Sequence, residues 1–292
     1  MVVKKIIDIL QITMETPKAF GWFHLLWLCL MVLAIICLSK IKHNEKNLKR
    51  ILLTYAIVSI VLEVLKAISW SFNYDEITNV ITWDYEWYTF PFQLCSTPIY
   101  VSLICSFLKR RKLRTTLLSY LAFVTIIGSI SAILMPDSCF TNEILININT
   151  MWIHYGAFVI SMYLLIKGEV KVNNLNLKRA LIVFLICVSI ALLLNIIIYN
   201  TGILNGETFN MFYISPYFIS ILPVFDTIQQ NVPYIVFLLI YILALSLGSL
   251  IIYFIAKLLK KIKLWKFFGV FYCFLFDICY NINKFFEEWD YE

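Results

Sequence analysis

The sequence predicts an all-α membrane protein built as a seven-helix transmembrane bundle. The 292-residue chain is 61% hydrophobic and only 14% charged, with a mean hydropathy of +0.84, which is typical of a polytopic membrane protein. Its apolar residues also form seven runs of 18 to 23 residues, near the roughly 20 that a helix needs to cross the hydrocarbon. They make one domain over 1–256, with spans at 20–39, 51–72, 89–108, 116–135, 149–166, 180–199 and 234–256.

Two of these runs need individual comment. The first, 20–39, is a span and not a cleaved signal peptide, because it is too long, lacks a small-residue cleavage site and leads into Lys40 and Lys42. The third, 89–108, contains two prolines: Pro91 suits a helix start and Pro98 suits a kink.

The basic residues predict how the bundle is oriented. The connections 40–50 and 109–115 each hold five Lys or Arg residues, and 167–179 holds four. The alternate connections 73–88, 136–148 and 200–233 hold none. The positive-inside rule therefore places the N-terminus outside and the C-terminus inside, although Lys4, Lys5 and Lys18 weakly oppose this. The net charge of +6 is thus a topology signal, and no nucleic-acid partner is expected.

Two segments outside the spans are unusual. The connection 200–233 is apolar and aromatic, so we expect either a folded cover over the bundle mouth, partly re-entrant, or an interfacial aromatic belt. The segment 257–292 begins with a lysine cluster and continues with an apolar stretch that has one polar face. It predicts an amphipathic helix on the cytoplasmic leaflet, with its lysines on anionic headgroups. An eighth span is the alternative.

Ionisable or reactive groups inside the spans gather at one depth. By the helix rise of about 1.5 Å per residue, five of them lie roughly 6 to 14 Å below the outer boundary. Asp137 caps a span on the same side. Because such groups are costly in hydrocarbon, they predict a functional site. The five are His24, Glu63, Lys66, Cys95 and His154.

Each member of this cluster has a structural and a functional interpretation. Glu63 and Lys66 are three residues apart on one helix face, so they form either a plain ion pair or a grip for a lipid phosphate. Cys95 is either a packing residue or a nucleophile, and His154 is either a hydrogen-bonded structural residue or a base. His24 would line the cavity or orient a partner. The eight cysteines fit neither a disulfide framework nor a zinc site, so no metal and no cofactor are expected.

Ordered short motifs over most of 20–256 give the chain a family resemblance. They are Phe20-Gly21-Trp22-Phe23-His24-Leu25-Leu26, the run from Pro91 to Cys95, Met135-Pro136-Asp137, His154-Tyr155-Gly156, and the run from Asn210 to Tyr213 before Pro216. The chain resembles the bacterial YwaF-like integral membrane proteins and is similar to their eukaryotic relative, a multi-span acyltransferase acting on ether phospholipids. Gln93 departs from the pattern, because many relatives have His there.

The resemblance implies an acyl-transfer site with Cys95 as nucleophile and His154 as base, in a bacterial plasma membrane protein. Gln93, Asp137 and Asn210 would support the site beside His24, Glu63 and Lys66. The partners would be phospholipids or lysophospholipids of the outer leaflet, and the enzyme an acyltransferase or a lipase. The alternatives are a lipid or ion transporter, and a non-catalytic receptor or assembly factor.

Overall fold

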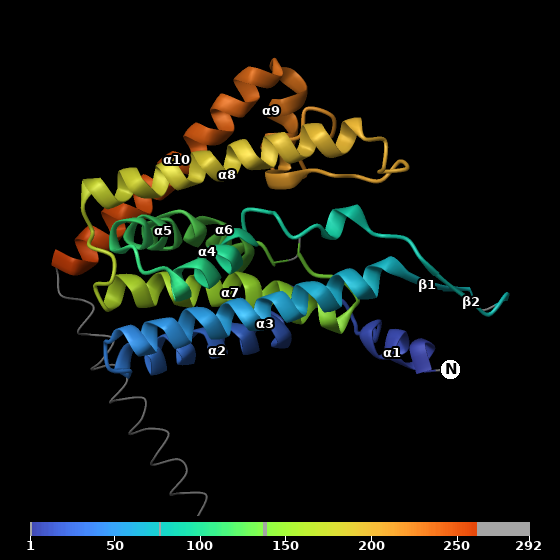
Figure 1. Cartoon of the computed structure of the whole chain (residues 1–292), viewed down its shortest axis with the longest axis horizontal. Helices are drawn as coiled ribbons and strands as arrows, with labels where there is room; N and C mark the ends of the chain where they lie inside the picture. Colours follow the sequence, from blue (N-terminus) through green and yellow to red (C-terminus); the bar gives the residue numbers. More distant parts are fainter. Residues whose placement is uncertain (1, 76, 137–138, 262–292) are drawn as a thin grey trace, which may run out of the picture.

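The computed structural model describes residues 2–75, 77–136 and 139–261 of the chain. It is a bundle of long helices, with a small hairpin at one end (Figure 1). The predicted helix of the segment 257–292 lies outside the described residues, apart from Lys257 to Lys261, which continue the last helix of the bundle. Asp137 also lies outside them.

Within the described residues, six helical stretches are long and apolar enough to cross a membrane, so the prediction of a helical membrane protein is confirmed. The third of them joins α5 (Arg111–Phe123) to α6 (Thr125–Leu134). The other five are α2 (Trp22–Lys40), α3 (Glu45–Ser71), α7 (Ile144–Ile166), α8 (Asn174–Asn200) and α10 (Tyr234–Lys261).

The predicted span 89–108 is not a membrane-length helix, so six of the seven predicted spans appear as full-length helices in the described residues. Only α4 (Thr97–Phe107) is helical there, and its 11 residues would cover about 16 Å, half of a bilayer core. Pro98 lies in its first turn and starts this helix instead of kinking a longer one. The preceding chain holds the short 3-10 helix η1 (Trp87–Thr89) and a turn around Pro91.

The break between α5 and α6 has a local cause. The Ser161 hydroxyl of α7 donates to the Leu121 carbonyl at 2.6 Å, and the Thr125 hydroxyl donates to the same oxygen at 2.9 Å. Val124 joins the two helices at φ −101° and ψ −51°. A neighbouring side chain that occupies a helix carbonyl is an established cause of a bend.

Helices α3 and α7 pack antiparallel along a polar seam. The Tyr55 hydroxyl donates to the Ile153 carbonyl at 3.2 Å, and the Trp152 indole donates to Ser59 Oγ at 3.0 Å. One further turn along, Asn149 Nδ2 donates to Glu63 Oε1 at 3.0 Å. Each step forward on α3 therefore meets a step backward on α7. This register sets the position of every site residue on the two helices.

The connection between α8 and α10 folds into a compact cover, as one of the two interpretations of its sequence predicts. It contains the 3-10 turn η3 (Met211–Tyr213) and the short helix α9 (Phe225–Asn231). Phe209 and Phe212 are fully buried, so the aromatic residues serve as a core and not only as an interfacial belt. Asn195 of α8 anchors the cover, because its amide accepts from the Met211 N–H at 2.7 Å and donates to the Met211 carbonyl at 3.0 Å.

The two ends of the bundle differ in character. At one end lie α1 (Val2–Leu10) and an antiparallel hairpin of β1 (Phe72–Asp75) and β2 (Val80–Trp83), paired from Phe72 with Trp83 to Asp75 with Val80 (Figure 1). At the other end lie the basic α2–α3, α4–α5 and α7–α8 connections (Figure 1). We call these the hairpin end and the basic end.

Candidate functional site

A cavity of about 530 Å³ opens between α3, α6, α7 and α10 in the half of the bundle nearer the hairpin end. Five of the residues predicted as site residues line it: Cys95, His154, Glu63, Lys66 and Gln93. Most of its remaining wall is apolar, with contributions from α6, the cover and the first turns of α10. The cavity is therefore amphipathic, which suits a ligand that has a polar head and an acyl chain.

The polar wall of the cavity is built on the α3–α7 seam. Lys66 Nζ donates to Glu63 Oε2 at 2.7 Å, and the second carboxylate oxygen of Glu63 accepts from Asn149. Glu63 is only 5% exposed, whereas the Lys66 side chain retains 17%. Because the carboxylate is satisfied on both oxygens, the ammonium of Lys66 presents the accessible charge of the pair.

Cys95 lies in the turn that leads into α4. The turn is tight because the Gln93 carbonyl accepts from the N–H groups of Ser96 and Thr97, at 2.9 and 3.1 Å. In the described part of the chain, the N–H groups of Leu94 and Cys95 have no hydrogen-bond acceptor. The thiol is half-buried and lines the cavity beside two backbone donors that remain available.

His154 reaches the cavity from α7 and is half-buried. The Gly128 carbonyl of α6 faces its ring, and its Nδ1 is buried without a hydrogen-bond partner among the described residues. No hydrogen bond joins Cys95 to His154 in that part of the chain. The Oδ1 atom of Asn149 is likewise buried and has no partner there. Two cavity residues thus keep polar atoms that a bound ligand or water would satisfy.

Gln93 ties the Cys95 turn to the cover. Its Nε2 donates to the Asn210 carbonyl at 2.9 Å, and its Oε1 accepts from the Phe212 N–H at 2.7 Å. Asn210 is 3% exposed and does not line the cavity; its side chain accepts from the Ser215 N–H and donates to the Ile219 carbonyl. Gln93 and Asn210 therefore affect the site by positioning the backbone of the Cys95 turn and of the cover.

His24 lies outside the cavity, so the expectation that it lines the site is wrong. It is fully buried on α2, where its Nδ1 accepts from the Phe20 N–H at 3.0 Å. Its ring packs against Tyr155 and Phe140, at centroid distances of 6.3 and 6.2 Å. Tyr155 and His154 are neighbours on α7 and point about 100° apart, and Phe140 lines the cavity, so His24 lies behind the cavity wall and not in it.

The structure also adds residues that were absent from the predicted site. Asn149 completes the Glu63 pair, and Tyr213 and Tyr241 line the cavity. Asn149 had a usable signal, because it is a buried amide at the start of a predicted span on the same side as His154. The two tyrosines had none, since aromatic residues are common in every part of this chain. No three His, Cys, Asp or Glu side chains in the described residues gather closely enough to hold a metal ion.

The fold and the cavity define a class: a polytopic helical membrane protein with an amphipathic internal site in one half of its bundle. Within that class the chain belongs to the TMEM164 family, whose sequence model matches residues 19–243. The match covers the bundle from the start of α2 into α10, including every residue that lines the cavity except Leu245. No curated protein and no solved structure shows significant similarity to the chain.

Proposed function

We propose that the protein is an intramembrane acyltransferase or lipase that carries an acyl group as a thioester on Cys95. The observation that carries this proposal is the placement of a thiol, an imidazole and an accessible ammonium on one amphipathic cavity. The resemblance to YwaF-like proteins and to an ether-phospholipid acyltransferase supports the same chemistry. The substrates would be a phospholipid, as acyl donor, and a lysophospholipid or water.

In the first half-reaction, His154 takes the proton of the Cys95 thiol, directly or through one water. The thiolate attacks the ester carbonyl carbon of the phospholipid, and a C–S bond forms. The tetrahedral intermediate then breaks its C–O bond. The departing alkoxide of the lysolipid takes the proton back from the imidazolium. The products are an acyl thioester on Cys95, a neutral His154 and a lysophospholipid.

In the second half-reaction, an acceptor hydroxyl attacks the thioester carbonyl and gives its proton to His154. The C–S bond breaks, and the leaving thiolate regains a proton from the imidazolium. A lysophospholipid hydroxyl gives transfer, whereas water gives hydrolysis. The reaction is a balanced exchange of one ester for another or for a free acid, and it consumes no cofactor.

The developing oxyanion has donors within the Cys95 turn. The N–H groups of Leu94 and Cys95, which have no acceptor among the described residues, belong to the same turn as the nucleophile, as in sites where backbone donors stabilise acyl-transfer intermediates. Lys66 lies on the same cavity as a point charge for the lipid phosphate, held in place by Glu63 and Asn149. The apolar wall formed by Ile127, Leu222 and Leu245 would receive an acyl chain.

An enzyme is favoured over a transporter because the cavity belongs to one half of the bundle. Toward the basic end, the α3–α4–α5 interface is packed with Leu48, Leu52, Cys105 and Leu121, each no more than 1% exposed. A transport pathway would need polar groups continuing through this region. The intramembrane charges of Glu63 and Lys66 lie on the hairpin side of that packing.

We place the cavity toward the outer leaflet, in a bacterial plasma membrane, with the N-terminus outside. This follows from the basic residues, which gather at the opposite end of the bundle. The orientation is tested by labelling single cysteines in intact cells with a membrane-impermeant reagent. Labelling in the 109–115 connection but not in the 73–88 hairpin would reverse it.

The decisive test of the chemistry is to trap the acyl-enzyme. Purified protein is incubated with a phospholipid that carries a labelled acyl chain, and the adduct is challenged with hydroxylamine, which cleaves thioesters. Wild-type protein should form a hydroxylamine-labile adduct, and Cys95→Ala should form none. Cys95→Ser and His154→Ala should lose several orders of magnitude in turnover, because nucleophile and base act as a unit.

Two other cysteines provide matched controls. Cys105→Ala and Cys187→Ala remove thiols that do not line the cavity, so they should stay active. Unchanged thermal unfolding of Cys95→Ala separates a lost nucleophile from a lost fold, because one small packing side chain costs only about 1–2 kcal/mol. Full turnover by a folded Cys95→Ala protein would refute the proposal.

A further inference from the structure

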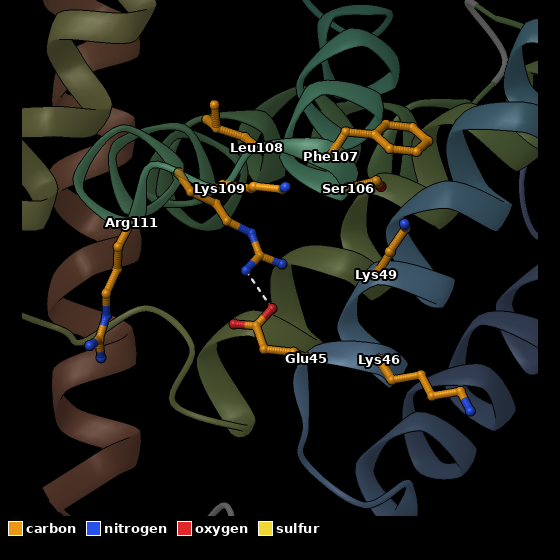
Figure 2. A pocket seen from close by; sticks show the side chains of 9 residues that line it. Glu45, Lys46, Lys49, Ser106, Phe107, Leu108, Lys109 and Arg111 are labelled. Atoms are coloured by element: carbon orange, nitrogen blue, oxygen red, sulfur yellow. Dashed lines mark hydrogen bonds and ion pairs between the residues drawn. The ribbon is translucent and has the colours of Figure 1, made fainter.

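A second pocket, of about 790 Å³, lies at the basic end of the bundle. It is formed where α3 begins, α4 ends and α5 begins, and it shares no residue with the cavity that holds Cys95. Figure 2 shows Lys49 and Lys109 on facing sides of the pocket, with Glu45 below them. The remaining lining residues are Lys46, Ser106, Phe107, Leu108, Arg111 and Arg114.

The pocket carries a large excess of positive charge. Five of its nine lining residues are Lys or Arg and one is acidic, so its formal charge is five minus one, or +4. Arg114 pairs with Glu45 and also donates from Nε to the Cys105 carbonyl at 3.0 Å, which holds the back of the pocket together. Among the residues that the structure describes, no carboxylate pairs with the other four cations.

The start of α5 is unfavourable for folding in the absence of an anion. Its first turn contains Arg111, Lys112 and Arg114 and no acidic residue, and its N-cap residue, Arg110, provides no capping hydrogen bond. Positive charges at a helix N-terminus oppose the helix dipole, whereas an anion there is favourable. A negatively charged ligand in the pocket would offset this unfavourable interaction between the positive side chains and the helix dipole.

The wall of the pocket also has an apolar part. Phe107 is 59% exposed, and Lys49 Nζ lies 4.8 Å from the centre of its ring. Leu108 continues this surface. Cations beside an exposed aromatic ring at the end of membrane-length helices match the boundary between lipid headgroups and acyl chains. A fully soluble anion would make no use of the aromatic wall.

From these observations we infer that the pocket binds the phosphate of an anionic phospholipid headgroup, with the lipid chain leaving past Phe107. Lys49 and Lys109, which face each other across the pocket, bind the phosphate, and Arg114 shapes the pocket. The site is separate from the cavity of the proposed reaction, so it would hold a resident lipid and not a substrate. The inference does not depend on whether the protein is an enzyme.

The test measures binding of phosphatidylglycerol to the full-length protein in nanodiscs of phosphatidylcholine. Wild-type protein should bind phosphatidylglycerol more tightly than phosphatidylcholine, and this difference in affinity should shrink as the salt concentration rises. Lys49→Ala combined with Lys109→Ala should reduce the affinity roughly 30-fold, because each lysine near an anionic surface contributes about 1 kcal/mol and 1.4 kcal/mol is a factor of ten. Lys49→Arg combined with Lys109→Arg should retain it.

A charge-matched control is available outside the pocket. Lys112→Ala combined with Lys178→Ala removes the same charge from residues that do not line it, and should bind as wild type. An equal loss of phosphatidylglycerol affinity in both double variants would show that net charge alone causes the effect, and it would overturn the proposed site. Displacement of phosphatidylglycerol by inorganic phosphate or glycerol phosphate at matched ionic strength would instead mark a site for soluble phosphate, which also contradicts the inference.

Discussion

Gly156 of α7 lies against the Tyr55 ring of α3, and Gly156→Ala should destabilise the protein. A Cβ atom at this position would lie 2.7 Å from Cε2 and 2.9 Å from Cδ2 of Tyr55. Carbon atoms in contact prefer about 3.5–4.0 Å, so the ring or the helix must move by nearly 1 Å. The ring has little freedom, since it stacks on Trp152 at a centroid distance of 6.4 Å and its hydroxyl donates to the Ile153 carbonyl.

The expected magnitude follows from three effects. Overpacking of this kind costs about 1–3 kcal/mol, and weakening the Tyr55 hydrogen bond adds about 1 kcal/mol. Replacing glycine by alanine inside a helix recovers about 1 kcal/mol. We therefore expect a net loss of about 1–3 kcal/mol. That corresponds to a fall of several degrees in the melting temperature of the detergent-solubilised protein.

A matched glycine on the neighbouring helix provides the control. At Gly128 of α6 an added Cβ would meet only Leu94 Cδ2, at an ordinary contact distance of 4.0 Å. Gly128→Ala should leave the melting temperature unchanged or raise it. Tyr55→Leu should relieve the clash, so the double variant with Gly156→Ala should be more stable than the two single effects added together. A Gly156→Ala protein that melts at or above wild type would refute the reasoning.

Three further substitutions test the contacts around the cavity. Gln93→Leu removes both hydrogen bonds to the cover and should cost about 1–3 kcal/mol, seen as faster limited proteolysis within 200–233. Asn195→Leu should lower the melting temperature at least as much, because it leaves the buried Met211 N–H without a partner and the Met211 carbonyl with only the long 3.4 Å hydrogen bond from the Ile214 N–H. Asn200→Leu, at an exposed position, should be nearly neutral. Glu63→Leu should cost about 3–5 kcal/mol by leaving Lys66 uncompensated. Glu63→Gln should cost clearly less, because its amide oxygen can still accept one of the two hydrogen bonds. Equal melting temperatures for these two variants would contradict a structural role for the pair.

Much of the bundle could be predicted because span length and helix rise constrain it strongly. The runs around α2, α3, α7, α8 and α10 are apolar for a full bilayer width, and the structure makes each of them a long helix. The same regularity predicted a shared depth for Glu63, Lys66 and His154, and all three line one cavity. Cys95 also lines it, but from a non-helical turn, so helix rise does not account for its position. Depth along a helix depends only on residue count, so sequence was sufficient for it.

The errors arose where direction around a helix or local backbone chemistry decides the outcome. His24 packs against Tyr155 and Phe140 instead of lining the cavity, because a depth argument does not say toward which side of its helix a residue points. The run 89–108 is apolar enough to span, but Pro91, Pro98 and the hydrogen bonds of Gln93 hold half of it out of a helix. A hydropathy average measures only how apolar a segment is, and it does not detect prolines or side-chain hydrogen bonds that interrupt a helix.

The double hydrogen bond of Gln93 has a consequence for the order of events in a catalytic cycle. Phe212 and Tyr213 of the cover both line the cavity, so a lipid that entered past them would displace one of the two. The Phe212 N–H donates a hydrogen bond to Gln93, which is two residues from Cys95. Movement of Phe212 would therefore also disturb the turn that holds the thiol. Under the proposed function, the cavity could then not admit a substrate and hold the reactive geometry at the same time. The proposed chemistry would be confined to the closed form, in which bulk water has least access and an acyl group would pass more readily to a lipid than to water.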